Sequence, residues 1–171
     1  ADGLIRSTSR DGGDVRIGIG ADHAGYDLKA PLIDSLQALG HEVVDVGAFG
    51  LDATDDYPDV AKAVAELVVG SRVERGILVC GSGVGACVAG NKVRGVRASV
   101  CHDTYSARQG VEHEDMNGLC LGQRSVGVEL AKEVVAVFIS AAFSGAERHR
   151  RRLDKVLAME AEWAERAVTS G

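Results

Sequence analysis

Short apolar runs alternate with longer segments of helical periodicity, five times along the chain. This alternation is typical of parallel strands joined by helices, because a parallel pair needs a long crossover connection. We therefore predict one three-layer α/β domain, with a five-stranded parallel sheet, helices on both of its faces and a further C-terminal helix. The strands are expected at residues 15–20, 41–47, 76–80, 96–101 and 118–122.

The segments between these runs have the spacing of amphipathic helices. In the first segment, Leu28, Leu32, Leu36 and Leu39 recur every three or four residues, and Gly40 follows as a stop signal. Helices are expected at residues 26–39, 55–69, 86–91, 103–112, 126–142 and 146–168.

Composition excludes several classes of protein. With 25 acidic and 19 basic residues the net charge is −6, which argues against a general nucleic-acid-binding protein. The longest apolar run, residues 134–143, is about half the length that crosses a bilayer, so we expect a soluble protein without membrane association. Three of the four cysteines lie in or beside apolar runs of a chain too long to need disulfides, which indicates reduced thiols.

The first residues of the chain differ from the rest. Residues 1–14 are polar, rich in small side chains and without the apolar core of a secretory leader. We expect them to form a flexible extension, followed by a single domain at residues 15–168. Reduced cysteines and the absence of a leader together predict a cytoplasmic location.

Polar side chains follow most of the expected strands directly. The carboxyl ends of parallel strands share one edge of the sheet, and ligands of such folds bind there, near the switch in strand order. These residues are therefore expected to lie close together. They are Asp22 and His23 after the first strand, Cys80 to Ser82 after the third, His102 and Asp103 after the fourth, and Arg124 after the fifth.

The segment Cys80-Gly-Ser-Gly-Val-Gly-Ala86 joins an expected strand to an expected helix. Its three glycines let backbone N–H groups face a ligand, so the loop fits a phosphate or an oxyanion. A tight strand-to-helix turn explains the same glycines equally well. The pattern also fits a dinucleotide fingerprint with Asp103, but it follows the third strand and precedes a short helix, which disfavours that function. No lysine follows the glycines, which excludes a Walker-type loop.

Single residues near this edge allow more than one role. Cys80 ends a strand beside a helix start, where a thiolate is favoured, although a buried unreactive cysteine is the more common occupant. Ser82 fits either a helix cap or a hydrogen-bond donor to a substrate. His23, His102 and His113 lie among acidic residues, but neither His-x3-His nor Cys-x2-Cys spacing occurs, so no metal site is predicted.

Five basic residues occur within residues 147–155. Helical spacing places Arg148 and Arg152 on one face, whereas Arg150 and Arg151 point elsewhere. Two guanidinium groups on one face fit a phosphate clamp. A solvated helix surface is the alternative interpretation, and the sequence pattern alone favours it.

Five motifs follow one another over about residues 15–160. They are Gly20-Ala-Asp-His-Ala-Gly25, Asp56-Tyr-Pro58, Gly76-Ile-Leu-Val-Cys-Gly-Ser-Gly-Val-Gly85, Ala89-Gly-Asn-Lys92 and Gly145-Ala-Glu-Arg-His-Arg-Arg-Arg152. Together they resemble the ribose-5-phosphate isomerase B family, which also includes the galactose-6-phosphate isomerase subunits. The resemblance implies a Rossmann-like homodimer, in some members a tetramer, with the active site at the subunit interface. It also implies that no metal or organic cofactor is needed.

The resemblance implies roles for three catalytic residues. Cys80 matches the catalytic base, Ser82 matches a residue that contacts the reacting hydroxyls, and His113 matches the histidine that opens the sugar ring. Some relatives carry a glutamate base further along the loop, but residues 85–87 here read Gly-Ala-Cys, so the cysteine type fits.

The resemblance also implies a substrate-binding set, part of which the partner subunit contributes. The loop amides match an anion hole, two side chains match substrate contacts and four match the phosphate site. These are Gly81, Gly83, Val84 and Gly85; Asp22 and Tyr57; and His23, Arg124, Arg148 and Arg152.

One position departs from the family pattern. Glu114 follows His113, where members often have asparagine, and a carboxylate near the sugar hydroxyls changes which substrate fits. We expect an aldose–ketose isomerase of a phosphorylated sugar, with ribose 5-phosphate and ribulose 5-phosphate as the first candidates. A tetrulose phosphate, a hexose phosphate or a free aldose are alternatives. An NAD-dependent oxidoreductase and a non-catalytic sugar-phosphate sensor are less favoured.

Overall fold

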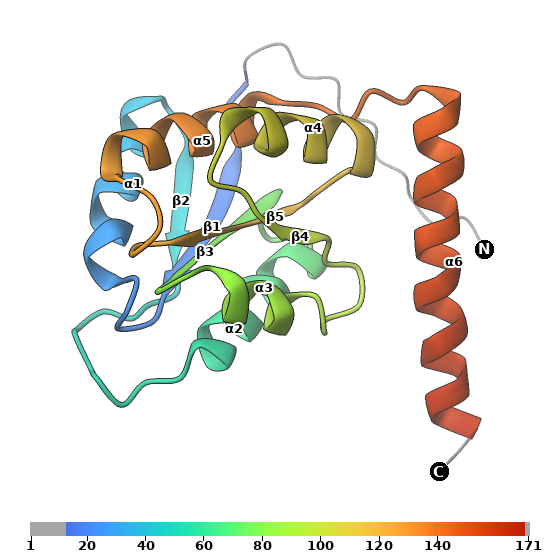
Figure 1. The fold of residues 1–171 in the computed structure, drawn as a ribbon, viewed down its shortest axis with the longest axis horizontal. Helices are drawn as coiled ribbons and strands as arrows, with labels where there is room; N and C mark the ends of the chain where they lie inside the picture. Colours follow the sequence, from blue (N-terminus) through green and yellow to red (C-terminus); the bar gives the residue numbers. More distant parts are fainter. Residues whose placement is uncertain (1–12, 170–171) are drawn as a thin grey trace.

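Five strands pair in parallel to form one sheet in the computed structural model, which describes residues 13–169 (Figure 1). The strands are β1 (Arg16–Ala21), β2 (Glu42–Asp45), β3 (Arg75–Cys80), β4 (Ala98–Val100) and β5 (Gly118–Gly122). Their order across the sheet is β2-β1-β3-β5-β4. The predicted parallel sheet is confirmed. Residues 1–12, most of the predicted extension, lie outside the described residues.

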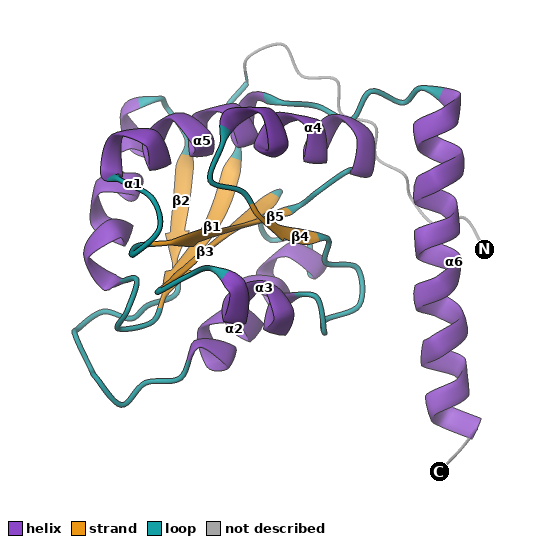
Figure 2. Ribbon diagram, in the orientation of Figure 1, coloured by secondary structure: helices purple, strands orange, loops and turns teal. Residues whose placement is uncertain are grey.

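Helices cover both faces of the sheet, as predicted (Figure 2). They are α1 (Tyr26–Ala38), α2 (Tyr57–Val69), α3 (Val84–Gly90), α4 (Thr104–Glu114), α5 (Val128–Ser140) and α6 (Glu147–Thr169). The helices α2 and α3 pack on one face, and α1 and α5 pack on the other with α4 beside α5. The long helix α6 stands at the side of these layers and packs against α4.

Strand order reverses between β1 and β3, because the chain leaves β1 toward β2 on one side and returns to add β3 on the other. The carboxyl ends of β1 and β3 therefore lie at the switch point of the sheet, which is where such folds bind ligands. Small residues bring α2 close to this part of the sheet. A Cβ at Gly20 would lie 2.5 Å from Val60 Cγ1, and one at Gly76 would lie 2.6 Å from Val64 Cγ1. Glycine in both strands is what allows α2 to pack so tightly.

The apolar core is divided by the sheet. The larger part lies beneath α1 and α5, where fully buried side chains such as Ile19, Leu32 and Phe138 meet. Burial of each such side chain stabilises the fold by about 1.5–3 kcal/mol. The smaller part lies beneath α2 and α3 and includes Cys80 and Cys120. The sulfur of Cys80 is thus anchored in the core although it lies at the sheet edge.

Two strands are shorter than the sequence predicts. Residues 41–47 form a strand only over Glu42–Asp45, and residues 96–101 form one only over Ala98–Val100. The expected start of β4 is diverted because the backbone N–H of Arg97 donates to the side-chain oxygen of Asn117 at 2.7 Å rather than to a neighbouring strand.

The helix α6 is held to the domain by one buried leucine and by a hydrogen bond further along. Leu153 is buried, whereas Val156, Met159 and Trp163 are exposed. Further along, Glu160 accepts the backbone N–H of Gly95 at 2.9 Å. None of the helices in residues 13–169 has both the length and the apolar character needed to span a membrane.

Candidate active site

Two titratable side chains, Asp22 and His23, follow β1 at the carboxyl edge, beside the switch point. Asp22 is 5% exposed, and its Oδ1 accepts the backbone N–H of Gly25 at 3.1 Å. Burial raises the pKa of Asp22, although the hydrogen bond from Gly25 partly opposes the change. A side chain at Gly25 would collide with β3, since its Cβ would lie 2.5 Å from the carbonyl carbon of Val79. The turn after β1 is therefore pressed against the end of β3.

His23 forms a pair with Asp55, which sequence reasoning did not identify. The Nδ1 of His23 lies 2.6 Å from Asp55 Oδ1, and the same oxygen accepts the backbone N–H of His23 at 2.9 Å. The hydrogen bond to Asp55 raises the pKa of His23, and the nearby charge of Asp22 adds to the effect. The Oδ2 of Asp55 is buried without a hydrogen-bond partner among the described residues. The pair favours a positively charged His23 at the carboxyl edge of the sheet.

The loop after β3 wraps around the sulfur of Cys80. The backbone N–H of Gly83 donates to Cys80 Sγ at 3.1 Å, so the loop folds back onto the sulfur. Gly83 has a φ of +82°, and a Cβ there would lie 3.0 Å from the carbonyl carbon of Leu121. Only glycine fits this left-handed position without strain. One backbone N–H, that of Gly83, thus points at the end of β3, and ligand binding by the loop stays a prediction.

Ser82 does not occupy the cap position of α3, one of its two predicted alternatives, because the N-cap residue is Gly83. Its Oγ accepts the backbone N–H of Val84, the first residue of α3, at 3.2 Å. The amides of Gly83 and Val84 therefore already have acceptors inside the loop. An anion bound by the loop would compete with Ser82 Oγ and Cys80 Sγ for these two N–H groups. The Ser82 side chain itself is exposed and accessible to a substrate.

Two further predicted residues lie against the same loop. The ring of Tyr57, at the start of α2, lies over Gly85, where a Cβ would be 2.9 Å from Tyr57 Cζ. Arg124 follows β5, and its backbone N–H donates to the carbonyl oxygen of Gly81 at 3.0 Å. A Cβ at Gly81 would lie 3.6 Å from Arg124 Nη1. Side chains from four strand ends or helix starts therefore meet at one place. We call this set the carboxyl-edge half-site; it consists of Asp22, His23, Asp55, Tyr57, Cys80 to Gly85 and Arg124.

His113 lies elsewhere. The helix α4 begins after β4 at the carboxyl edge and runs back to the amino edge, where the Arg97 guanidinium before β4 bonds Asp115 at 2.8 Å. His113 lies in the last turn of α4, so it is at the opposite edge of the sheet from Cys80. The Gln109 amide lies 2.9 Å from His113 Nδ1. The structure therefore does not bring His113 to Cys80 within one chain.

The beginning of α6 lies beside His113. The ring of His149 stacks on the ring of His113, with their centroids 3.9 Å apart. The positive charges of Arg148 and Arg152 act on His149, so both arginines belong to the same neighbourhood. We call this set the helix half-site; it consists of His113, Glu114, Arg148, His149 and Arg152.

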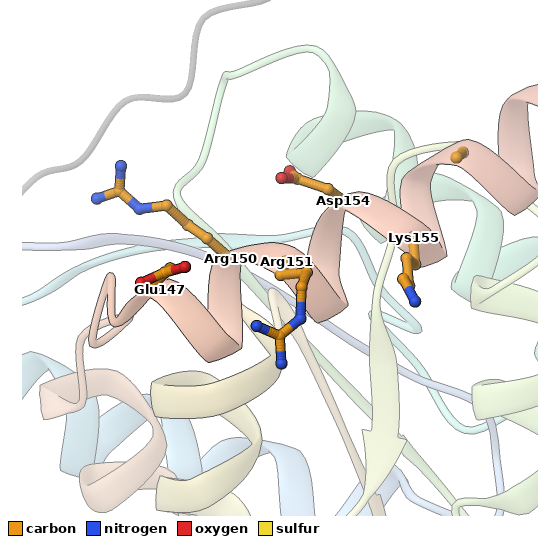
Figure 3. A pocket seen from close by; sticks show the side chains of 6 residues that line it. Glu147, Arg150, Arg151, Asp154 and Lys155 are labelled. Atoms are coloured by element: carbon orange, nitrogen blue, oxygen red, sulfur yellow. The ribbon is translucent and has the colours of Figure 1, made fainter.

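Three further cations near the start of α6 occupy a different part of the helix surface. Arg150, Arg151 and Lys155 surround a shallow hollow together with Glu147 and Asp154 (Figure 3). Arg150 Nε also donates to the carbonyl oxygen of Gly145 at 3.1 Å. Arg151 therefore serves as a comparison residue for Arg148 and Arg152.

Among residues 13–169, one group of side chains has the donor atoms that a metal site needs. Donor atoms of Asp22, His23 and Asp55 lie within 4.8 Å of one another. The sequence spacing gave no sign of this group, because it comes from two separate loops. An ion here would have to break the 2.6 Å contact between His23 and Asp55. The absence of a metal from the reaction stays a prediction.

An open parallel sheet that gathers a core-anchored sulfur and titratable groups at its switch point is typical of α/β enzymes that act on small molecules. Comparison with known proteins makes the class specific. The chain belongs to the ribose/galactose isomerase family, whose model matches residues 17–156. The predicted family resemblance is thereby confirmed.

Several relatives match nearly their whole length. Ribose-5-phosphate isomerase B of Escherichia coli (strain K12) is 43% identical over 145 residues, which cover 85% of this chain and 96% of that protein. D-erythrulose-4-phosphate isomerase of Pectobacterium atrosepticum is 43% identical over 134 residues, which cover 77% and 86%.

Solved structures agree in fold. A structure of Clostridium thermocellum ribose-5-phosphate isomerase B has a TM-score of 0.83 at 44% identity, covering 86% of this chain and 99% of that one. The Mycoplasma genitalium ribose-5-phosphate isomerase B structure with bound ribulose 5-phosphate has a TM-score of 0.81 at 41% identity, covering 86% and 97%.

Proposed function

We propose that this protein is an aldose–ketose isomerase that interconverts ribose 5-phosphate and ribulose 5-phosphate. The observation that carries this proposal is the glycine loop folded around Cys80 Sγ at the switch point, in a chain 43% identical to a ribose-5-phosphate isomerase B. A thiolate at that place removes the proton from C2 of the open-chain aldose. An enediolate forms, and the proton returns to C1. Loop amides stabilise the negative charge that develops on oxygen.

The reaction takes place, in this proposal, between two copies of the chain. The carboxyl-edge half-site holds the base, and the helix half-site holds His113 and the two arginines at the opposite edge of the sheet. A symmetric dimer brings the half-site of one copy to the complementary half-site of the other. His113 then opens the sugar ring, and Arg148 and Arg152 join His23 and Arg124 at the phosphate.

The surface around α6 supports assembly with a second copy. Val156, Met159 and Trp163 recur at helical spacing and remain exposed. Val156 and Leu153 also line a groove that reaches the short edge strand β4. An exposed apolar stripe beside an unpaired strand edge is a surface that favours a partner. Dimer or tetramer formation and the cytoplasmic location stay predictions.

A four-carbon sugar phosphate is the second candidate substrate. Two of the matching relatives are D-erythrulose-4-phosphate isomerases, from Pectobacterium atrosepticum and from Mycolicibacterium smegmatis. Glu114, exposed next to His113, adds a carboxylate to the helix half-site. A four-carbon sugar is shorter than ribose and would leave more room beside the Glu114 carboxylate.

The proposal is tested with the purified protein and both sugar phosphates. Ribose 5-phosphate is expected to give the higher kcat/KM. At substrate concentrations well below KM, mixing Cys80→Ala chains with Arg152→Ala chains is expected to restore roughly a quarter of wild-type activity after subunit exchange, because half of the dimers then contain one intact site. Lack of turnover with any phosphorylated sugar refutes the function. Turnover without complementation refutes the shared site only.

The His23–Asp55 pair leads to a prediction about protonation. Asp55→Asn is expected to lower the pKa of His23 toward its ordinary value, because the charged acceptor at 2.6 Å is lost. KM for the sugar phosphate should then rise at a lower pH than in the wild type. NMR titration of His23 measures the shift. Asp59→Asn, an exposed position on α2, is the control and should leave the titration unchanged.

The same pair links pH to stability. The pKa of His23 is raised in the folded state, so the bond between protonated His23 and Asp55 adds to the free energy of unfolding. This stabilisation is fully present below the ordinary histidine pKa and is lost as pH rises through the raised value. A wild-type stability advantage over Asp55→Asn that grows with pH in this range would contradict the assignment.

A further inference from the structure

We propose that His149 is a positioning residue that fixes the His113 ring for sugar-ring opening, while the proton transfer at Cys80 does not depend on it. This inference rests on the proposed function. It assigns a role to a buried histidine that the reaction as described above leaves unused.

The position of His149 is defined by a short chain of contacts. Its side chain is 2% exposed, and its Nδ1 lies 2.6 Å from Ser144 Oγ. Ser144 in turn donates its backbone N–H to the carbonyl oxygen of Glu112 in α4 at 2.9 Å, and its Oγ accepts the N–H of Ala146 at 3.2 Å. The Ser144 hydroxyl therefore bonds both the start of α6 and the His149 ring. The connection between α5 and α6 thus clamps the His149 ring onto α4.

The clamped ring fixes His113 from one face. The two imidazole planes are inclined by 27°, with a centroid distance of 3.9 Å. Gln109, one turn earlier on α4, engages His113 Nδ1 at 2.9 Å. The stack on His149 sets the plane of the His113 ring, and the contact with Gln109 sets its rotation within that plane. Because Nδ1 is engaged by Gln109, Nε2 is the nitrogen presented to a substrate. A general acid or base works only when such an orientation is held.

The surroundings keep His149 uncharged. Burial lowers the pKa of His149, and the positive charges of His113, Arg148 and Arg152 lower it further, against a smaller opposing effect of Glu114. A neutral ring beside His113 can stack without adding a second positive charge. Two cations already approach from α6, so a protonated His149 would disfavour protonation of His113.

The buried edge of His149 argues against a role in packing alone. Its Nε2 has no hydrogen-bond partner among the described residues, and a buried polar atom without a partner costs stability. An apolar aromatic ring would pack there without that cost. Histidine at this position is better explained by its bond to Ser144 and its stack on His113.

Ring opening and proton transfer make separate chemical demands. Opening the furanose breaks the bond between C1 and the ring oxygen; the ring oxygen gains a proton and the anomeric hydroxyl loses one. Ribulose 5-phosphate has no ring to open, because its C5 oxygen carries the phosphate. Exchange of its C1 proton in heavy water therefore needs the base and the phosphate site but not the His113 step.

The test compares two rates in His149→Ala. Turnover of ribose 5-phosphate is expected to fall by roughly tenfold or more, since a freely rotating His113 rarely meets the ring oxygen. Exchange of the ribulose 5-phosphate C1 proton, followed by NMR, should stay within about twofold of the wild type. His149→Phe keeps a stacked ring but loses the bond to Ser144, and it should recover part of the lost turnover.

Control variants separate this role from other causes. Leu153→Ala changes a buried residue one turn along the same face of α6 and should lower both rates in proportion or neither. Cys80→Ala should abolish both. A proportional loss of turnover and exchange in His149→Ala, or no loss of either, overturns the inference. Absence of both reactions in the wild-type protein instead refutes the proposed function.

Discussion

Cys80→Ala will abolish turnover while the fold remains intact. The sulfur lies at the end of β3 and accepts the N–H of Gly83, so its removal deletes the proposed base. Loss of a general base lowers kcat by about 100-fold to 10,000-fold. The lost sulfur atom costs on the order of 1 kcal/mol of stability, because the site is buried but small. Steady-state kinetics and circular dichroism measure the two effects. Residual activity above a few per cent would identify another base.

Cys87 is the matched control for this substitution. It lies on α3, half-buried, and its pKa is lowered to about 6, chiefly by a hydrogen bond from Cys120. Cys87→Ala should leave turnover unchanged. A thiol with this pKa is largely ionised at neutral pH and reacts with iodoacetamide as well. Inactivation by alkylation and protection by substrate should therefore be measured in the Cys87→Ala background.

Arg148→Ala and Arg152→Ala will each raise KM for the sugar phosphate about tenfold. Each loses a charge-assisted contact with the phosphate, which is worth about 1.5–3 kcal/mol. Arg151→Ala should change KM little, because this side chain is exposed beside the hollow of Figure 3, and an exposed ion pair contributes at most about 1 kcal/mol. Initial rates over a range of substrate concentrations measure KM. Equal effects of all three substitutions would mean that the phosphate is held elsewhere.

The fold was predictable because its signals are local. Apolar runs and helix stop residues mark every strand and helix within a few positions. The exception at residues 96–97 has a cause that is far away in sequence, since Asn117 takes the N–H of Arg97. No local sequence pattern indicates that a distant side chain will accept a backbone N–H in place of a neighbouring strand.

The candidate site was predictable only in part, for the same reason. The loop around Cys80 is one continuous segment, so its glycines indicate its geometry directly. Asp55 reaches His23 across 32 positions, and before the fold is known it is one of several acids ahead of α2. The sequence also did not indicate that His113 and Cys80 lie apart. That separation follows from the direction of α4, which returns the chain to the opposite edge of the sheet.

The two half-sites lie at opposite edges of the sheet, so in the proposed reaction one chain alone holds no complete site. A single folded chain would carry the proposed base at one edge and the proposed ring-opening acid at the other, and catalysis would require two chains to associate. Specific activity will then depend on protein concentration, and it will decline on dilution below the dissociation constant of the assembly. Recovery after dilution will follow second-order kinetics. Substrate that bridges the two half-sites will slow dissociation, so the enzyme is held in its working form by the compound it consumes.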